Sequence, residues 1–378
     1  MGALTSTEPT LATHWYLSPD VFSAELENIW YRDWFCVGRS EDVPESGDFF
    51  TTSVGTQNLI VLRAESGALE AFHNTCRHRG ALLCTEDKGR FRNGRIICPY
   101  HTWTYSLNGD LLATPYRQSC DDFSNDDYSL YRIHVDTWGG YIFINLSESP
   151  ATTLSDFLGA EAENLRDWPL EDMVSVRRET LALACNWKLF WENYSECYHC
   201  PRIHPELCKV VPVYSEGVMG DVDLPGWQAE GDDDGRPKVA PGMVTWSASG
   251  QTQLPTLPGL SKRDLEAGAN FASFTASMYV VGHPDYVRSV RIVPVGPEST
   301  SLVIDWLLMP DVAEKHVDLI DEMTAFGRLV VEQDGAVCEL NQKGLHSLRH
   351  QHGVLVPQEH YLHEFHQWVK SRVGECVD

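Results

Sequence analysis

The feature that most constrains this chain is a pair of short motifs, each with one cysteine and one histidine. Cys76 and His78 form a C-x-H motif, and Cys98 and His101 form a C-x-x-H motif. Two thiolates and two imidazoles indicate a metal site, and zinc is the simplest candidate. Zinc fingers, however, place their two cysteines together and their two histidines together. One ligand of each kind from each of two loops instead favours a [2Fe–2S] cluster with two thiolates on one iron and two imidazoles on the other.

These motifs carry a family resemblance. The stretches C-R-H-R-G from Cys76 and C-P-Y-H-T-W from Cys98 closely resemble the two ligand loops of the Rieske family. The resemblance implies that both cysteines bind the inner iron, and that His78 and His101 bind the outer iron. Gly80 and Pro99 are expected to turn the backbone around the cluster. Cys84 has no place in this pattern and is expected to be a small buried apolar side chain.

A second metal motif follows in N-W-K-L-F-W-E-N-Y-S-E-C-Y-H-C-P-R-I-H, residues 186–204. We predict a helix up to Pro201, with Glu192, Glu196 and His199 on one face and His204 swinging back toward the same point. Two histidines need a carboxylate to make the facial triad of non-haem Fe(II) oxygenases. Position alone leaves several candidates for it: Asp321, Glu322, Glu332, Asp334 and Glu339.

The whole chain resembles the α subunit of a Rieske non-haem iron oxygenase. The resemblance rests on the two metal motifs in this order, the N-W-K helix and a late E-x-D segment, and it implies that Asp334 is the third iron ligand. The implied fold class is α+β, with an all-β Rieske domain and a helix-grip catalytic domain. We expect an N-terminal helical segment packed on the catalytic domain over residues 1–40, the Rieske domain over 41–150 and the catalytic domain over 151–378.

The same resemblance assigns a role to Glu196. The family forms head-to-tail homotrimers in which a carboxylate, usually aspartate, links an iron-ligating histidine to a cluster histidine of the next subunit. Here E-C-Y-H replaces the commoner D-x-Y-H, so Glu196 is the expected catalytic bridge. Cys197 and Cys200 form a C-x-x-C that could indicate redox or zinc chemistry, but the iron site already explains this segment.

Hydrophobic periodicity gives a coarse element map. Ser18 and Pro19 predict the start of a short helix, and alternation up to about Ser147 predicts a mostly β region with a two-residue hairpin turn at Asn108-Gly109. Strands are expected at 174–185, 273–281, 286–295 and 301–310. A long helical stretch from 311 is expected to break near Gly335, and residues 230–264, rich in Gly, Pro and Asp, predict a mobile loop or lid.

Composition limits the partners. Lys and Arg number 29 against 54 Asp and Glu, for a formal net charge of −25, which disfavours nucleic acids and anionic membranes. No stretch is apolar enough to span a bilayer and the N-terminus lacks the pattern of a signal peptide, so a cytoplasmic location is expected. Eleven cysteines without a regular framework predict free thiols and metal ligands rather than disulfides.

The segment E-N-Y-S-E-C-Y-H-C with H-P-E-L-C most resembles the family branch acting on quaternary ammonium compounds, such as glycine betaine, carnitine and choline. The resemblance implies a monooxygenase that uses O₂ and NAD(P)H electrons, from a separate flavin or ferredoxin-type reductase, to hydroxylate or N-demethylate its substrate. One alternative is an oxygenase of the same family that oxidises an aromatic compound. Another is a protein without enzymatic activity, either a Rieske electron carrier or a zinc-stabilised binding protein, but the second metal motif argues against both. Aromatic side chains suit a cationic head group, with four candidates: Trp246, Tyr279, Tyr286 and Trp306.

Overall fold

The computed structural model describes residues 4–229 and 235–374. The chain divides into two compact units. The first, here called the β unit, spans Trp30–Phe157, and the second, the mixed unit, combines the residues up to Ile29 with the chain from Leu158 onward. One unit built of strands and one built of an antiparallel sheet with long helices confirm the predicted α+β class.

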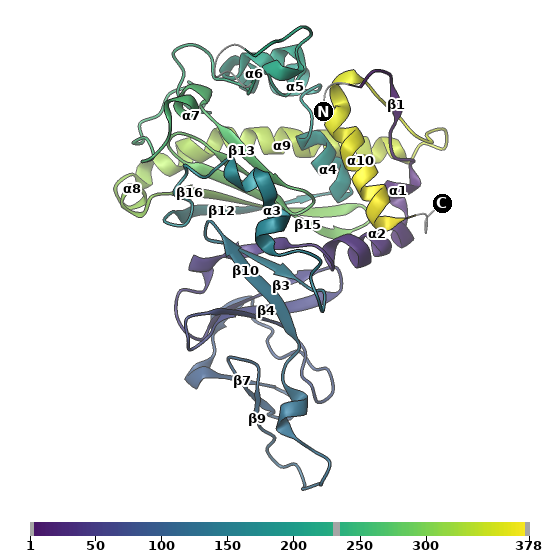
Figure 1. Cartoon of the computed structure of the whole chain (residues 1–378), viewed down its shortest axis with the longest axis vertical. Helices are drawn as coiled ribbons and strands as arrows, with labels where there is room; N and C mark the ends of the chain where they lie inside the picture. The colour runs from purple at the N-terminus through teal and green to yellow at the C-terminus, as the bar shows by residue number, and fades with distance from the viewer. Residues whose placement is uncertain (1–3, 230–234, 375–378) are drawn as a thin grey trace. The chain divides into compact units, whose positions relative to one another are not determined.

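The β unit contains two antiparallel sheets. The larger has seven strands in the order β2 (Phe35–Arg39), β11 (Tyr141–Asn145), β10 (Arg132–Trp138), β5 (Leu69–His73), β4 (Gln57–Arg63), β3 (Asp48–Val54) and β6 (Lys88–Arg90). The smaller joins β7 (Arg95–Ile97), β8 (Thr104–Ser106) and β9 (Leu111–Ala113), as Figure 1 shows. The sequence predicted a helical segment over residues 1–40, but strand β2 lies within this range. Its five residues are all buried, and its backbone pairs with β11.

The hairpin between β8 and β9 forms where Asn108-Gly109 predicted it, but its loop is longer than two residues. The strands end at Ser106 and resume at Leu111, and Gly109 has a φ of 86°. The amide of Gly109 donates to the carbonyl of Ser106 at 3.0 Å. Glycine adopts this left-handed conformation without steric cost, which explains why it closes the turn.

The mixed unit is organised around a five-stranded antiparallel sheet. Its order is β12 (Val174–Leu183), β16 (Ser299–Leu308), β15 (Val287–Gly296), β14 (Met278–Gly282) and β13 (Asn270–Phe274). The long helix α9 (Ile320–Leu345) and helix α4 (Trp187–Tyr194) pack against this sheet (Figure 1). The predicted strand at 273–281 is instead the end of β13, a turn and most of β14.

Shorter elements complete the chain. The two-stranded ribbon β1 (Glu8–Pro9) and β17 (Val354–Leu355) joins distant segments. The remaining helices are α1 (His14–Leu17), α2 (Pro19–Glu25), the π-helical turn Leu26–Trp30, α3 (Leu154–Glu163), α5 (Cys200–Ile203), α6 (Pro205–Val210), α7 (Lys262–Ala267), α8 (Pro310–Lys315) and α10 (His360–Val373). No helix among the described residues is long and apolar enough to cross a membrane.

Helix α2 begins as predicted, and a buried ion pair links it to helix α4 within the mixed unit. The Ser18 hydroxyl accepts from the amide of Asp20 at 3.2 Å, and Pro19 occupies the first turn. At the other end of the helix, Glu25 accepts from the ammonium of Lys188 on α4 at 2.5 Å, and both side chains are fully buried. A buried charge is tolerated when its partner is held beside it, so this pair fixes α2 against α4.

Helix α9 shows no break at Gly335, so that prediction was wrong. A Cβ at Gly335 would lie 2.7 Å from Cδ2 of Leu183 on strand β12. Glycine therefore permits a close approach of helix to sheet and does not end the helix. Gly327, two turns earlier, has the same relation to Arg288 of β15, whose Cδ would lie 3.1 Å from an added Cβ.

The predicted helix up to Pro201 was also wrong. Helix α4 ends at Tyr194, and a new helix, α5, starts at Cys200 with Pro201 in its first turn. Proline is favoured in the first turn because its missing amide hydrogen would have no partner there. The residues between the two helices form turns, and this break decides how the metal motif is displayed.

The Gly- and Pro-rich segment contains no helix or strand over residues 235–261. Helix α7 then starts inside the predicted loop, where Ser261 accepts from the amide of Asp264 at 3.2 Å and caps the helix. Residues 230–234 of the predicted lid lie outside the described residues.

Candidate active site

The two loops of the β unit that carry the first metal motif repeat one backbone pattern. In Cys76–Ala81 and Cys98–Trp103, the cysteine amide donates to the carbonyl five residues later, at 2.8 Å in both loops. Gly80 and Thr102 occupy equivalent positions with φ of 77° and 57°. Thr102, and not Pro99, is thus the counterpart of Gly80. The paired loops that the motif predicted are present.

The cysteines of these loops point inward and the histidines outward. Cys76 and Cys98 are 3% and 1% exposed and belong to the hydrophobic core of the β unit. The Nδ1 atoms of His78 and His101 lie 3.2 Å apart at the surface. Two buried thiols and two converging imidazole nitrogens fit a [2Fe–2S] cluster with mixed ligation.

The surroundings of the cluster loops add residues that the motif did not identify. The Tyr105 hydroxyl lies 3.3 Å from Sγ of Cys76, and burial raises the pKa of Tyr105, so the phenol remains a hydrogen-bond donor. Hydrogen bonds to ligand sulfur tune a cluster's potential. The ring of Trp103 stacks on His78 with centroids 4.8 Å apart. Cys84 is buried, as expected, and burial raises its pKa to about 11.

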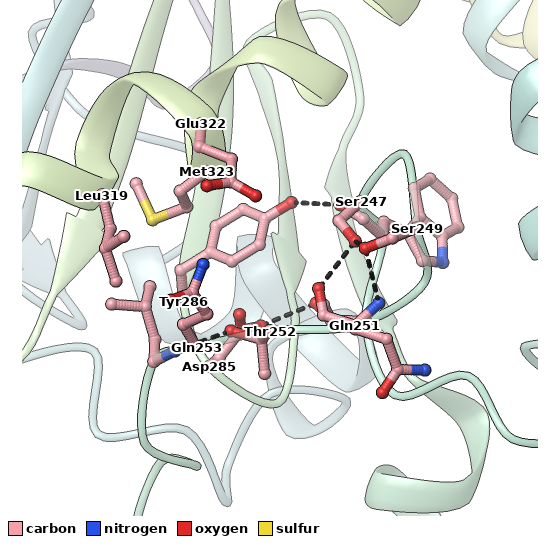
Figure 2. A pocket seen from close by; sticks show the side chains of 13 residues that line it. Ser247, Ser249, Gln251, Thr252, Gln253, Asp285, Tyr286, Leu319, Glu322 and Met323 are labelled. Atoms are coloured by element: carbon pink, nitrogen blue, oxygen red, sulfur yellow. Dashed lines mark hydrogen bonds between the residues drawn. The ribbon is translucent and has the colours of Figure 1, made fainter.

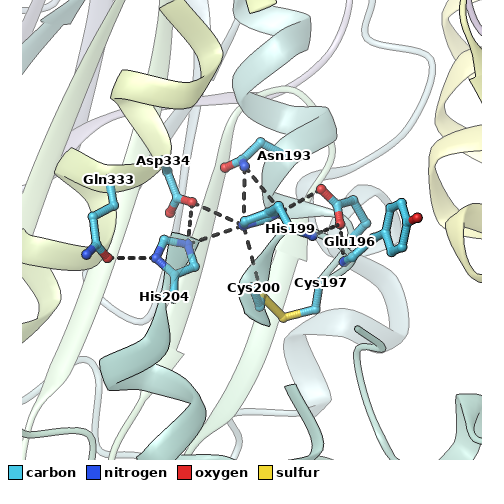
Figure 3. Close-up of a disulfide and its surroundings, with 9 residues drawn as sticks. Asn193, Glu196, Cys197, His199, Cys200, His204, Gln333 and Asp334 are labelled. Atoms are coloured by element: carbon cyan, nitrogen blue, oxygen red, sulfur yellow. Dashed lines mark hydrogen bonds and ion pairs between the residues drawn. A yellow bond between two sulfur atoms is a disulfide. The ribbon is translucent and has the colours of Figure 1, made fainter. Parts of the chain in front are cut away.

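The mixed unit brings His199, His204 and Asp334 together (Figure 3). Oδ1 of Asp334 lies 2.7 Å from Nε2 of His204 and 3.4 Å from Nε2 of His199. The two Nε2 atoms are 3.2 Å apart. His199 lies in the turn directly before α5 and His204 lies between α5 and α6, whereas Asp334 extends from α9. Two imidazoles and one carboxylate at a common point match the donor set of a facial triad.

Two further side chains orient the triad histidines. Oε1 of Glu196 lies 2.6 Å from Nδ1 of His199, and Oε1 of Gln333 lies 2.8 Å from Nδ1 of His204. Because each Nδ1 faces an acceptor, its proton is held there and Nε2 is the nitrogen that would bind a metal. Glu196 is fixed in turn, since it accepts from the backbone amides of Tyr198 and, at 3.2 Å, His199.

The electrostatics of the triad favour a cation. Burial lowers the pKa of His199, but its hydrogen bonds with Asp334 and Glu196 outweigh burial and raise the pKa to about 9. The same histidine partners outweigh burial at Asp334 and lower the pKa of that carboxyl. The three donors therefore suit a divalent ion better than an empty or apolar space.

The predicted shared face of Glu192, Glu196 and His199 does not exist, because α4 ends between Glu192 and Glu196. Glu192 instead accepts from the Tyr16 hydroxyl at 2.7 Å and lies 2.9 Å from Nε2 of His366. Other carboxylates that position alone had left open are engaged elsewhere. Asp321 pairs with Arg177, and Glu339 accepts from the amide of Ala184 at 2.9 Å.

Cys197 and Cys200 form a disulfide, contrary to the prediction that the cysteines remain thiols or metal ligands. The turn after α4 places their Cα atoms 4.9 Å apart, within the usual range for a disulfide. The bond closes a small ring that contains Tyr198 and His199 (Figure 3). The cysteine pair therefore belongs to the scaffold of the metal motif.

A cavity of about 60 Å³ reaches the triad, and five aromatic side chains form one part of its wall: Tyr194, Tyr214, Trp246, Phe271 and Tyr279. It adjoins a larger cavity of about 520 Å³, because Tyr194, Tyr214 and Phe271 line both. Of the four aromatic candidates from the sequence, only Trp246 and Tyr279 face the triad. Tyr286 lines a neighbouring cavity of about 150 Å³ (Figure 2), which shares Trp246 with the triad cavity, and Trp306 is fully buried in β16.

Comparison with known proteins accounts for both halves of the chain. Residues 33–128 match the Rieske [2Fe–2S] domain, and residues 170–375 match the ring hydroxylating alpha subunit (catalytic domain). The glycine betaine monooxygenase oxygenase subunit of Chromohalobacter salexigens is 30% identical, over 91% of this chain and 81% of that protein. The chloroplastic choline monooxygenase of Arabidopsis thaliana is 26% identical, over 96% and 81%.

Solved structures share the fold. The quaternary ammonium Rieske monooxygenase CntA in complex with L-carnitine superposes with a TM-score of 0.72 at 23% identity, covering 97% of this chain and 96% of that chain. Naphthalene 1,2-dioxygenase from Rhodococcus sp. gives a TM-score of 0.72 at 18% identity, covering 97% and 95%. The match of residues 170–375 to the catalytic domain argues against a simple electron carrier. The chain belongs to the ring-hydroxylating α subunits and is a Rieske-type oxygenase.

Proposed function

We propose that this oxygenase is a monooxygenase that hydroxylates or N-demethylates a quaternary ammonium compound such as glycine betaine. The observation that carries the proposal is the aromatic wall of the cavity at the triad. The similarity of the chain to glycine betaine and choline monooxygenases supports the same substrate class. A methylated ammonium group has no N–H to donate, so aromatic faces bind it better than hydrogen-bond acceptors do.

The aromatic side chains of the cavity support one another. Tyr194 and Tyr279 stack with ring centroids 3.7 Å apart, and Trp246 meets Phe271 edge-on at 5.7 Å. Packing of this kind fixes the ring orientations before a ligand arrives, which reduces the entropy lost on binding. The cavity therefore offers a rigid apolar surface beside the metal ligands.

The metal sites would supply the redox chemistry: Cys76, Cys98, His78 and His101 would hold a Rieske cluster that transfers single electrons, and the triad would hold a mononuclear Fe(II) for O₂ chemistry. The protein contributes position and exclusion of water. Gln333 and Glu196 hold the imidazoles in one tautomer, and the aromatic wall keeps the substrate carbon near the triad.

Electron supply requires partners. We expect a separate flavin or ferredoxin-type reductase fed by NAD(P)H, and a cytoplasmic homotrimer in which Glu196 links the two metal sites across the subunit interface. Glu196 suits this role because one carboxylate oxygen holds His199 while its side chain is still 11% exposed. The bridge to a cluster histidine remains a prediction.

The test is turnover with a matched reductase and a panel of glycine betaine, carnitine, choline, stachydrine and simple aromatic acids. We expect substrate-dependent O₂ uptake with a methylammonium compound, and formaldehyde when an N-methyl carbon is attacked. Asp334→Ala serves as the inactive control for uncoupled reductase activity. Coupled turnover with aromatic acids alone would replace the proposal with oxidation of an aromatic compound, which the same apolar wall also accommodates.

A further inference from the structure

A buried arginine shares the cavity with the triad. Arg288 lies on strand β15, is 4% exposed, and lines the cavity together with His199, His204 and Asp334. Arginine is almost never this deeply buried without a carboxylate partner, because removing its charge from water is costly. The groups around Arg288 therefore indicate which kind of ligand the cavity binds.

Within residues 4–229 and 235–374, Arg288 has no carboxylate at ion-pair distance. Its Nη1 donates to the carbonyl of Gly327 at 2.9 Å, and its Nε has no acceptor. The absence of a side chain at Gly327 makes room for the guanidinium against α9. The carboxylates of this cavity are already committed, Asp334 to His204 and Glu196 to His199.

A second donor on the same wall is also unsatisfied. The indole Nε1 of Trp246 is buried and has no acceptor among the described residues. Buried donors without acceptors are rare in native proteins, and each costs free energy. One positive charge and two vacant donors belong to residues that line a single cavity, and together they point to an anionic ligand.

We infer that Arg288 binds a carboxylate of the substrate, so that the enzyme takes a zwitterionic betaine and not a choline-type cation. The inference rests on the proposed function, whose substrate class it narrows. A guanidinium binds a carboxylate through two parallel hydrogen bonds, and the ligand's charge would neutralise that of Arg288. A cation without a carboxylate would bring a second positive charge beside an unpaired one, which Coulomb repulsion opposes.

The test compares ligands that share the trimethylammonium group but differ in the carboxylate. We would titrate oxidised protein, without reductase, with glycine betaine, choline and benzoate by calorimetry. We expect glycine betaine to bind at least about tenfold more tightly than choline, the effect of one charge-assisted contact. Equal affinity for the two in the wild type would overturn the inference and leave quaternary-amine binding intact.

Variants of Arg288 provide the second arm. Arg288→Met should weaken glycine betaine binding about 10- to 100-fold without weakening choline binding, and Arg288→Lys should fall between. Unchanged betaine affinity in Arg288→Met would overturn the inference. If Arg288→Met does not fold, the inference is tested by the ratio of betaine to choline affinity in the wild type and by the betaine affinity of Arg288→Lys. Arg288-dependent binding of benzoate without betaine binding would keep the carboxylate contact but refute the proposed amine substrate.

Discussion

Gln333 offers a sharp test of how the triad would hold the proposed mononuclear metal. Metal binding requires the Nε2 lone pair of His204, so the imidazole proton must sit on Nδ1, 2.8 Å from the Gln333 oxygen. In the metal-free protein the imidazole proton of His204 can instead reside on Nε2, because Nε2 lies 2.7 Å from Oδ1 of Asp334. Gln333→Leu therefore penalises the metal-bound state and largely spares the metal-free one.

The magnitude follows from burial. His204 is 2% exposed, so water cannot replace the lost acceptor, and an unsatisfied buried donor costs about 1–3 kcal/mol. That corresponds to a loss of about 10- to 100-fold in iron affinity, the usual effect of removing the hydrogen-bond partner of a ligating histidine. Gln333→Glu keeps the acceptor and should keep the affinity.

The assay is iron content per chain after equilibration with a graded chelator, with the visible absorption of the cluster followed in the same samples. The cluster ligands lie in the β unit, so that absorption should not change. Glu332→Gln, an exposed neighbour on α9, is the matched control. Wild-type iron affinity in Gln333→Leu, or equal loss in Glu332→Gln, would refute the role assigned to Gln333.

Three further predictions concern the metal sites and a buried thiol. Asp334→Ala should lower iron from about three to about two per chain while the cluster spectrum stays; full activity in this variant would mean that another carboxylate is the ligand. Glu196→Gln should retain both metals but leave a pre-reduced cluster reduced in the presence of O₂ and substrate, whereas loss of mononuclear iron would make Glu196 a ligand. Because burial raises the pKa of Cys84 to about 11, its thiol stays protonated at pH 8, and mass spectrometry should show slower alkylation than at exposed Cys120, accelerating as the pH nears 11. Equal rates at pH 8 would contradict this.

The candidate metal donors that are close together in the chain were the easiest to predict from the sequence. The C-x-H and C-x-x-H loops and the pair His199 and His204 are local motifs, so spacing alone identified them. Asp334 comes from another helix, and position left several carboxylates open until the family resemblance selected it. Contacts between distant segments are set by packing, which short motifs do not encode.

The residues that support the site were missed for the same reason. Gln333 was missed because only the fold brings α9 beside His204, and Arg288 because only the fold brings this residue of β15 to the cavity. A partial signal was present for Arg288, since two arginines, Arg288 and Arg291, interrupt the mostly apolar strand of residues 286–295, but the sequence does not tell which of them lines a cavity. The end of α4 was missed because Pro201 was taken to stop a helix, although proline equally favours the start of one.

The absence of a side chain at Gly335 also affects which substitutions this enzyme tolerates next to the triad. Gly335 follows Asp334, and an added methyl group would meet Leu183 about 0.7 Å inside the ordinary contact distance of 3.4 Å. Metal–ligand bonds accept displacements of about 0.2 Å, so accommodating alanine by moving α9 would carry the carboxylate out of reach. At Gly335, therefore, alanine preserves the triad only if the flexible end of Leu183 turns aside while α9 stays in place, so the tolerance of this position depends on a side chain of strand β12 that lies far from it in the sequence.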